Sequence, residues 1–150
     1  MHYPKYTEIT ASPDFDVFEF ISIGIKGEII KKIQFAETYY PGIYNLGFGD
    51  KINEADIDDE TDSNNGDRDK VLATVADVVY FYTSIYPDRN IIFFGSNDVR
   101  TRLYRMAISN NFELLNKDFH IFAVQLVNGR IIRIPFSHNI NCIGFLIKRK

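Results

Sequence analysis

Hydrophobic and polar positions alternate along the first third of the chain in the manner of β-strands. Residues 17–23 run Val-Phe-Glu-Phe-Ile-Ser-Ile, and residues 29–35 resume the same β-branched and aromatic character. Gly24 and Gly27 bracket the turn between these two runs, which predicts a β-hairpin. A further apolar run at residues 43–49 predicts a third strand, so we expect the chain to open with an antiparallel set of strands.

The spacing changes to that of a helix in the middle of the chain. Apolar residues recur at helical intervals from Val71 to Ile85, and Pro87 ends the pattern. This arrangement predicts a helix that packs against a sheet. The uninterrupted apolar run at residues 91–94 predicts a strand that is covered on both faces, at the centre of that sheet.

A second helix is expected after this strand, with Ser96 or Asn97 as its N-cap. Its buried stripe is predicted to consist of Val99, Leu103, Met106 and Ala107. The following asparagines, Asn110 and Asn111, are expected to end it.

The last third of the chain returns to strands. Residues 119–127 and 130–136 form two runs of strand character, and the Asn128-Gly129 pair between them is a strong hairpin signal. A last strand is expected at residues 141–147. In this order the elements predict an α/β (α+β) fold, a single domain with a mixed, mostly antiparallel sheet of about seven strands and two main helices.

Composition narrows the class of protein. A chain of 150 residues with 45% hydrophobic residues has the size and composition of one globular domain. The single cysteine, Cys142, excludes an internal disulfide and favours a reducing, cytoplasmic location. No apolar run approaches the roughly 20 residues that a membrane span needs. The net charge of −3 disfavours nucleic acid as a partner, and no metal-ligand spacing surrounds His120 or His138.

Two joints between a polar turn or strand and a helix are candidate anion sites, because the first backbone N–H groups of a helix can bind anions. One joint, residues 63–69, precedes a helix that is expected to run to about Tyr86, and the other, residues 95–98, precedes the second helix. The candidate binding residues are Asn64, Asn65, Gly66, Asp67, Arg68, Ser96 and Arg100. The same residue types are preferred helix caps, so ordinary capping is the alternative interpretation.

Charge is spread unevenly along the chain. Residues 50–62 hold seven acidic residues against the lone Lys51, which predicts a solvated loop or a loop that docks a partner. Arg100, Arg102 and Arg105 on the second helix predict a solvated face, capture of an anion, or salt bridges to the acidic segment. Together the two charge runs suggest contact with a protein partner or a homodimer.

The order of elements resembles that of the GCN5-related N-acetyltransferases, in which antiparallel strands lead to a helix, a strand, a second helix and a final strand pair. The resemblance implies that the turn at residues 64–69 presents backbone N–H groups to the pyrophosphate of acetyl-CoA. The pair Leu103-Tyr104 resembles a Leu-Tyr pair of that family, which implies Tyr104 as the general acid.

A second resemblance runs nearly from end to end. Residues 44–50, 63–67, 71–75 and the Arg100–Tyr104 segment resemble a family of short bacterial proteins known only as a domain of unknown function. This resemblance implies a single-domain cytoplasmic protein and carries no activity. The first hypothesis is therefore a non-catalytic binding module. The alternative is a divergent acyl-CoA-dependent N-acyltransferase, and a less favoured third is nucleic-acid contact through the Arg-rich helix.

Overall fold

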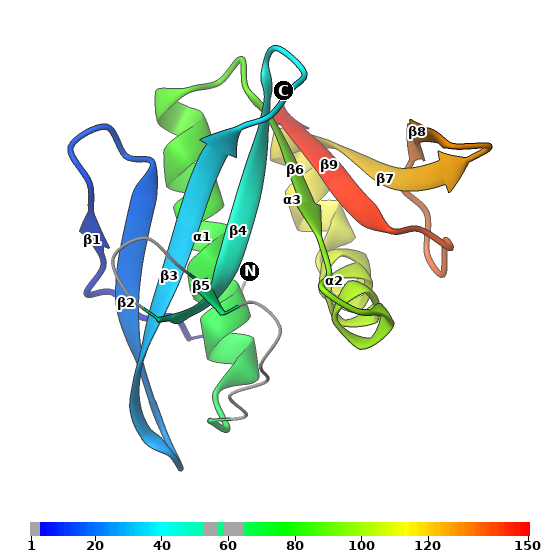
Figure 1. Ribbon diagram of the computed structural model, residues 1–150. Helices are drawn as coiled ribbons and strands as arrows, with labels where there is room; N and C mark the ends of the chain where they lie inside the picture. The colour runs from blue at the N-terminus through cyan, green and yellow to red at the C-terminus, as the bar shows by residue number, and fades with distance from the viewer. Residues whose placement is uncertain (1–3, 53–56, 59–64) are drawn as a thin grey trace. The chain divides into compact units, whose positions relative to one another are not determined.

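The structure is a computed structural model that describes residues 4–52, 57–58 and 65–150 (Figure 1). Within these residues the chain forms nine strands and three helices. They divide into two compact units, which we describe separately. Unit 1 comprises Met1–Ala36 and Leu46–Ile85, and unit 2 comprises Glu37–Asn45 and Tyr86–Lys150. The single domain expected from the sequence stays a prediction.

Unit 1 is built on the hairpin that the sequence predicts. Its elements are β1 (Thr10–Ala11), β2 (Val17–Gly24), β3 (Gly27–Glu37), the later part of β4 (Ile43–Lys51), β5 (Ile57–Asp58) and α1 (Arg68–Ile85). β2 and β3 pair antiparallel from Val17 opposite Gln34 to Gly24 opposite Gly27, which confirms the predicted turn. Two short strands add to these pairings: β1 extends the sheet beyond β2, within a segment expected to be an arm or a short edge strand, and β5, which was not expected, adds to β4 inside the acidic segment.

The core of unit 1 lies between α1 and one face of its strands (Figure 1). Phe18 and Phe20 of β2 are buried because alternate residues of a strand share one face. The Phe35 ring stacks on Tyr82 of α1 with centroids 3.7 Å apart. The helix predicted from the spacing of Val71 to Ile85 is thereby confirmed, and it carries the other half of this core.

Unit 2 contains the remaining strands and two helices. These are β6 (Asn90–Phe94), α2 (Asp98–Asn110), α3 (Phe112–Asp118), β7 (Phe119–Val127), β8 (Arg130–Pro135) and β9 (Gly144–Arg149), joined by the first residues of β4. The strands run in the order β4-β6-β9-β7-β8. The β4–β6 pair is parallel and the others in this unit are antiparallel, so the predicted mixed, mostly antiparallel sheet is confirmed. β6 has a neighbour on each side, as its apolar run predicts.

The buried stripe predicted for α2 is wrong at Val99 and Met106, whereas Leu103 and Ala107 are half-buried. Val99 is 77% exposed and Met106 is 49% exposed, whereas Thr101 and Ile108 are buried. The helix turns its Thr101 side inward because Gly95 approaches Thr101 so closely that a Cβ there would lie 2.3 Å from the Thr101 backbone nitrogen. Because the polar residue Thr101 lies on the buried face, the spacing of hydrophobic residues alone does not identify that face. The short helix α3 was not predicted either.

Candidate functional site

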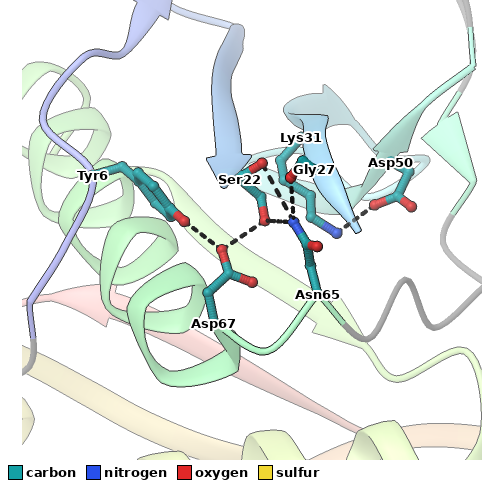
Figure 2. A network of polar contacts seen from close by, with 7 residues as sticks. All are labelled: Tyr6, Ser22, Gly27, Lys31, Asp50, Asn65 and Asp67. Atoms are coloured by element: carbon teal, nitrogen blue, oxygen red, sulfur yellow. Dashed lines mark hydrogen bonds and ion pairs between the residues drawn. The ribbon is translucent and has the colours of Figure 1, made fainter. Parts of the chain in front are cut away.

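Asn65, one of the residues predicted to bind an anion, holds the turn of the β2–β3 hairpin (Figure 2). Its side-chain Oδ1 accepts a hydrogen bond from the Lys26 backbone N–H at 2.6 Å. Its Nδ2 donates to the Gly27 carbonyl and to Ser22 Oγ, each at 3.0 Å. Its backbone carbonyl accepts from the Ile25 N–H at 3.1 Å. We call this set of contacts the Asn65 clamp; it leaves Asn65 only 3% exposed.

Two glycines make the clamp possible. A Cβ on Gly24 would lie 1.8 Å from the Asn65 carbonyl oxygen, so only glycine allows the two backbones to approach this closely. Gly66 has a φ of +83°, a conformation that L side chains rarely adopt, and it turns the chain from the clamp towards α1. The Asn65-Gly66 pair is thus explained by the structure: Asn65 binds the hairpin turn, and Gly66 allows the chain to bend directly after it.

Asp67 continues the network beyond Gly66. Its Oδ2 accepts hydrogen bonds from the Tyr6 hydroxyl and, at 2.6 Å, from Ser22 Oγ. Figure 2 shows both hydroxyl groups directed at this carboxylate, with the Asn65 amide on the far side of Ser22. Hydrogen bonds therefore run in series from Asn65 through Ser22 to Asp67, with Tyr6 joining at Asp67. Chains of this kind polarise one another and strengthen their members.

The N-terminal arm is fixed to α1 by Tyr6 and its neighbour. The Tyr6 backbone N–H donates to Thr74 Oγ1 at 2.8 Å, and the Lys70 ammonium lies 4.2 Å from the Tyr6 ring centroid. Lys5 pairs with Asp77 at 2.7 Å on the exposed surface. Burial raises the pKa of the Tyr6 phenol above its usual value, and the hydrogen bond to Asp67 raises it further. The phenol is therefore a stable neutral donor.

Two ion pairs link strands of unit 1 beside this network, one between neighbouring strands and one across β3. Lys31 of β3 pairs with Asp50 of β4, with the lysine side chain only 8% exposed. Lys51 pairs with Glu19 of β2 at 3.0 Å. Every buried side-chain nitrogen and oxygen of the described residues has a hydrogen-bond partner. In that part of the chain, therefore, no buried polar side-chain atom is left without a hydrogen bond for a ligand to complete.

The structure brings only some of the predicted anion-binding residues together. Asn65, Gly66 and Asp67 form the clamp and network, whereas the Arg68 guanidinium is mostly exposed and lies 3.7 Å from Asp69. Asn64 lies outside the described residues. The sequence pointed to this turn as an anion site, a role that stays a prediction, and it did not indicate that Tyr6, Ser22 and Gly24 contact the turn. Their participation depends on long-range contacts, and no local pattern in the sequence signals it.

The remaining predicted residues belong to unit 2. Asn97, rather than Ser96, is the N-cap of α2, and its Oδ1 accepts from the Arg100 backbone N–H at 2.9 Å. Ser96 is exposed and Arg100 is half-buried. The Tyr104 ring packs edge-on against Phe93, with centroids 6.1 Å apart. The roles of Ser96, Arg100 and Tyr104 in binding or catalysis stay predictions.

Cys142 is half-buried beside α2. Burial raises the pKa of its thiol, and the positive charge of Arg105 lowers it by less. The thiol form is therefore favoured, which is the reverse of what a nucleophilic cysteine needs.

Unit 2 carries a second notable feature at the end of the β7–β8 hairpin. Leu126 and Val127 of β7 are 59% and 43% exposed, and Ile131 and Ile132 of β8 are 54% and 39% exposed. We call these four residues the hairpin tip. Leu126 pairs directly with Ile131 across the ladder. The basic residues of β8, Arg130 and Arg133, flank the two isoleucines.

Charge separates the two units sharply. By sequence, unit 2 has ten Lys and Arg residues against five Asp and Glu, a formal charge of +5. Unit 1 has seven against fifteen, a formal charge of −8. The net charge of −3 for the whole chain is therefore the sum of an acidic unit 1 and a basic unit 2, and unit 2 carries the exposed hairpin tip.

The described elements place the chain among α+β proteins with a mixed sheet, and none of the helices among them is both long and apolar enough to cross a membrane. The chain belongs to a family of unknown function, DUF6934, whose model matches residues 2–150. Membership of a family of unknown function, predicted from the sequence, is confirmed. No curated protein and no solved structure matches the chain.

Proposed function

We propose that this protein is a non-catalytic binding module that contacts a protein partner through the hairpin tip of unit 2. The observation that carries this proposal is the exposure of four large apolar side chains, Leu126, Val127, Ile131 and Ile132, on one hairpin. Leu126 and Ile131 lie on one face of the hairpin and Val127 and Ile132 on the other, so each face exposes a pair of adjoining apolar side chains. Adjoining apolar side chains on a surface mark interaction sites more often than scattered ones do. Arginine is enriched beside such apolar contacts in interfaces, and Arg130 and Arg133 supply it.

The polar groups of the turn before α1 are hydrogen-bonded to one another and to the hairpin, which supports a non-catalytic role. A catalytic or cofactor-binding turn needs donors that are directed at a ligand. In the turn before α1, both side-chain polar atoms of Asn65 are engaged with the β2–β3 hairpin, and Asp67 Oδ2 is engaged with Tyr6 and Ser22. These groups hold the fold of unit 1 together.

Site-specific photo-crosslinking tests the proposal. A photoreactive residue placed at Ile131 should give a discrete covalent adduct with a partner protein in the native host cell. The same residue at Lys117, which is exposed on α3 of the same unit, should not give that adduct. A third position, Ile23 of β2, is 61% exposed and samples an exposed apolar surface of unit 1. Adducts at Ile23 alone, or equal labelling at Lys117, would contradict the proposal.

A divergent acyl-CoA-dependent N-acyltransferase is the second candidate, and the arrangement of strands favours it. β4 and β6 are parallel neighbours in unit 2 and α1 lies between them in sequence, followed by α2 and the final strands. This is the order that the resemblance to acetyltransferases describes. The residues of the turn fit acetyl-CoA poorly, because the Asn65 amide is engaged and Asp67 and Asp69 put negative charge where a pyrophosphate would bind.

Thermal melting with acetyl-CoA separates the two candidates. A ligand at about 100 times its dissociation constant adds about 2.7 kcal/mol to the free energy of unfolding, which is several degrees for a chain of this length. Millimolar acetyl-CoA should leave the melting temperature unchanged if the binding module is correct. A shift with acetyl-CoA that inorganic phosphate does not reproduce would favour the acyltransferase.

A further inference from the structure

β8 is an edge strand of unit 2. Among the described strands it pairs only with β7, and the strand order ends at β8. The outer side of an edge strand presents backbone N–H and C=O groups in the spacing that another strand requires. Such an edge is a template for an extended peptide, which adds to the sheet by main-chain hydrogen bonds and gains specificity from alternate side chains.

On each face of β8, an arginine side chain lies beside at least one isoleucine side chain. Ile131 and Arg133 lie on one face, and Arg130, Ile132 and Ile134 lie on the other, because successive residues of a strand alternate. Each face therefore offers one arginine beside apolar residues. Neither Arg130 nor Arg133 forms an ion pair with any of the described residues. The Arg133 guanidinium lies 4.6 Å from the Phe122 ring centroid, which holds it over the sheet.

We propose that β8 binds an extended acidic segment of a partner protein as an added strand. This inference rests on the proposed binding function and names the partner's chemistry. Charge complementarity argues for an acidic segment, because unit 2 has a formal charge of +5 and the two β8 arginines lack carboxylate partners among the described residues. A second copy of β8 is disfavoured, because it would bring four arginines onto one ladder.

The spacing of the arginines sets the spacing of the carboxylates. In antiparallel addition, successive partner residues lie opposite Ile134, Arg133, Ile132, Ile131 and Arg130. Apolar residues suit the isoleucines and carboxylates suit the arginines, so the complementary core is Val-Glu-Val-Val-Glu. Its two carboxylates are three residues apart and lie on opposite faces of the sheet. A strand with carboxylates two residues apart puts both on one face and can match only one arginine.

Peptide titration followed by NMR tests the inference. Two unlabelled peptides are added in turn to the isotopically labelled protein. The first contains the core Val-Glu-Val-Val-Glu, and the second contains Val-Glu-Val-Glu-Val, which has the same composition. The first should shift the backbone amide signals of Arg130–Ile134 most strongly. The second should bind about threefold to fivefold more weakly, the value of one exposed ion pair. Equal affinity for the two peptides, or shifts centred elsewhere, would overturn the inference.

Charge reversal supplies the second test. The double variant R130E/R133E should bind the acidic peptide at least about tenfold more weakly, since two attractions become two repulsions. It should instead bind the same peptide with lysine in place of glutamate. The control variant R102E/K117E changes the charge of unit 2 by the same amount at exposed positions on α2 and α3, and it should bind the acidic peptide almost normally. Equal losses in the two double variants would show general electrostatic attraction and refute strand addition.

The two proposals fail in different ways. If Ile131 crosslinks to a partner in cells but the acidic peptide causes no shift at about millimolar concentration, strand addition is refuted and the binding function stands. If the peptide binds β8 with the expected spacing preference but no partner crosslinks at Ile131, the edge has the proposed chemistry and the proposed function fails.

Discussion

The two hairpins of this chain end in turns with opposite surroundings. The β2–β3 turn is held by Asn65, which makes three hydrogen bonds to the backbone of the turn, at Ile25, Lys26 and Gly27. The β7–β8 turn is Asn128-Gly129, and among the described residues no hydrogen bond reaches these two residues from another segment. Both turns are at the surface, but one is held by a distant residue of unit 1, whereas the other, within the described part of the chain, contacts only its own strands in unit 2.

This difference indicates that the β2–β3 turn contributes to stability and that the β7–β8 hairpin is available for recognition. A turn whose polar groups are satisfied by a distant residue contributes to the cooperative fold, because breaking one contact leaves buried groups unpaired. A turn that meets only its own strands can be altered with little effect on the rest of the unit. We therefore expect substitutions at the β2–β3 turn to act on unfolding and substitutions at the β7–β8 hairpin to act on binding.

The largest effect is expected for Gly24→Ala. The new Cβ would lie 1.8 Å from the Asn65 carbonyl oxygen, so the clamp must open or the backbone must move. Overpacking against backbone costs about 3 kcal/mol. Gly47→Ala is the matched control in β4, because its Cβ meets nothing closer than 3.8 Å. Chemical denaturation of both variants measures the difference, and an equal loss in the two would show that the clamp is not the cause.

Asn65→Ala is expected to follow, with a loss of about 2 to 3 kcal/mol, because it leaves the Gly27 carbonyl and the Lys26 N–H without their partner. Asn128→Ala makes the same change in the other hairpin. Its cost should be about 1 kcal/mol, from placing alanine at a φ of 49°. Hydrogen exchange at Lys26 should speed up only in the first variant. A larger loss at Asn128 would reverse the comparison.

The sequence predicted the elements of both hairpins because their signals are local. Gly24 and Gly27 bracket one turn, Asn128-Gly129 forms the other, and both pairings are as expected. The helix of unit 1 and the position of β6 between two strands were predicted from spacing and from an uninterrupted apolar run, and both are confirmed. The expected cover on both faces of β6 is incomplete, because only Ile91 is buried and Phe94 is 40% exposed. These elements depend on neighbours within a few residues.

The surroundings of the elements were harder to predict because they depend on distant residues. Asn65 was selected as an anion ligand, whereas in the structure its side chain binds a hairpin about 40 residues away. Its amide group offers the same donors for either task, and the sequence does not say which acceptor meets them. The buried face of α2 was mispredicted because Thr101 occupies it. Tyr6 gave no local signal at all.

Tyr6→Phe should cost about 1 kcal/mol at neutral pH, since the hydroxyl joins Asp67 and the Ile23 N–H while the ring keeps its stack on Phe20. The pKa of Tyr6 is raised in the folded state, so its contribution is fully present below the unfolded pKa of about 10 and is lost as pH rises further. The stability difference between the two proteins should therefore shrink above about pH 10. Urea melts across this range measure it, and a constant difference would contradict the assignment.

The smallest effect on stability is expected at the hairpin tip. Leu126→Ser and Ile131→Ser remove side chains that are 59% and 54% exposed and directly paired, so each should change the free energy of unfolding by less than about 0.5 kcal/mol. The double variant should nevertheless lose the crosslinked adduct, here formed from a photoreactive residue at Ile132, because interface energy concentrates in a few apolar side chains. Circular dichroism melts and crosslinking on the same preparations separate the two effects. A large loss of stability would mean that the tip belongs to the fold of unit 2, and the contrast between a hairpin held by a distant residue and one that contacts only its own strands would fail.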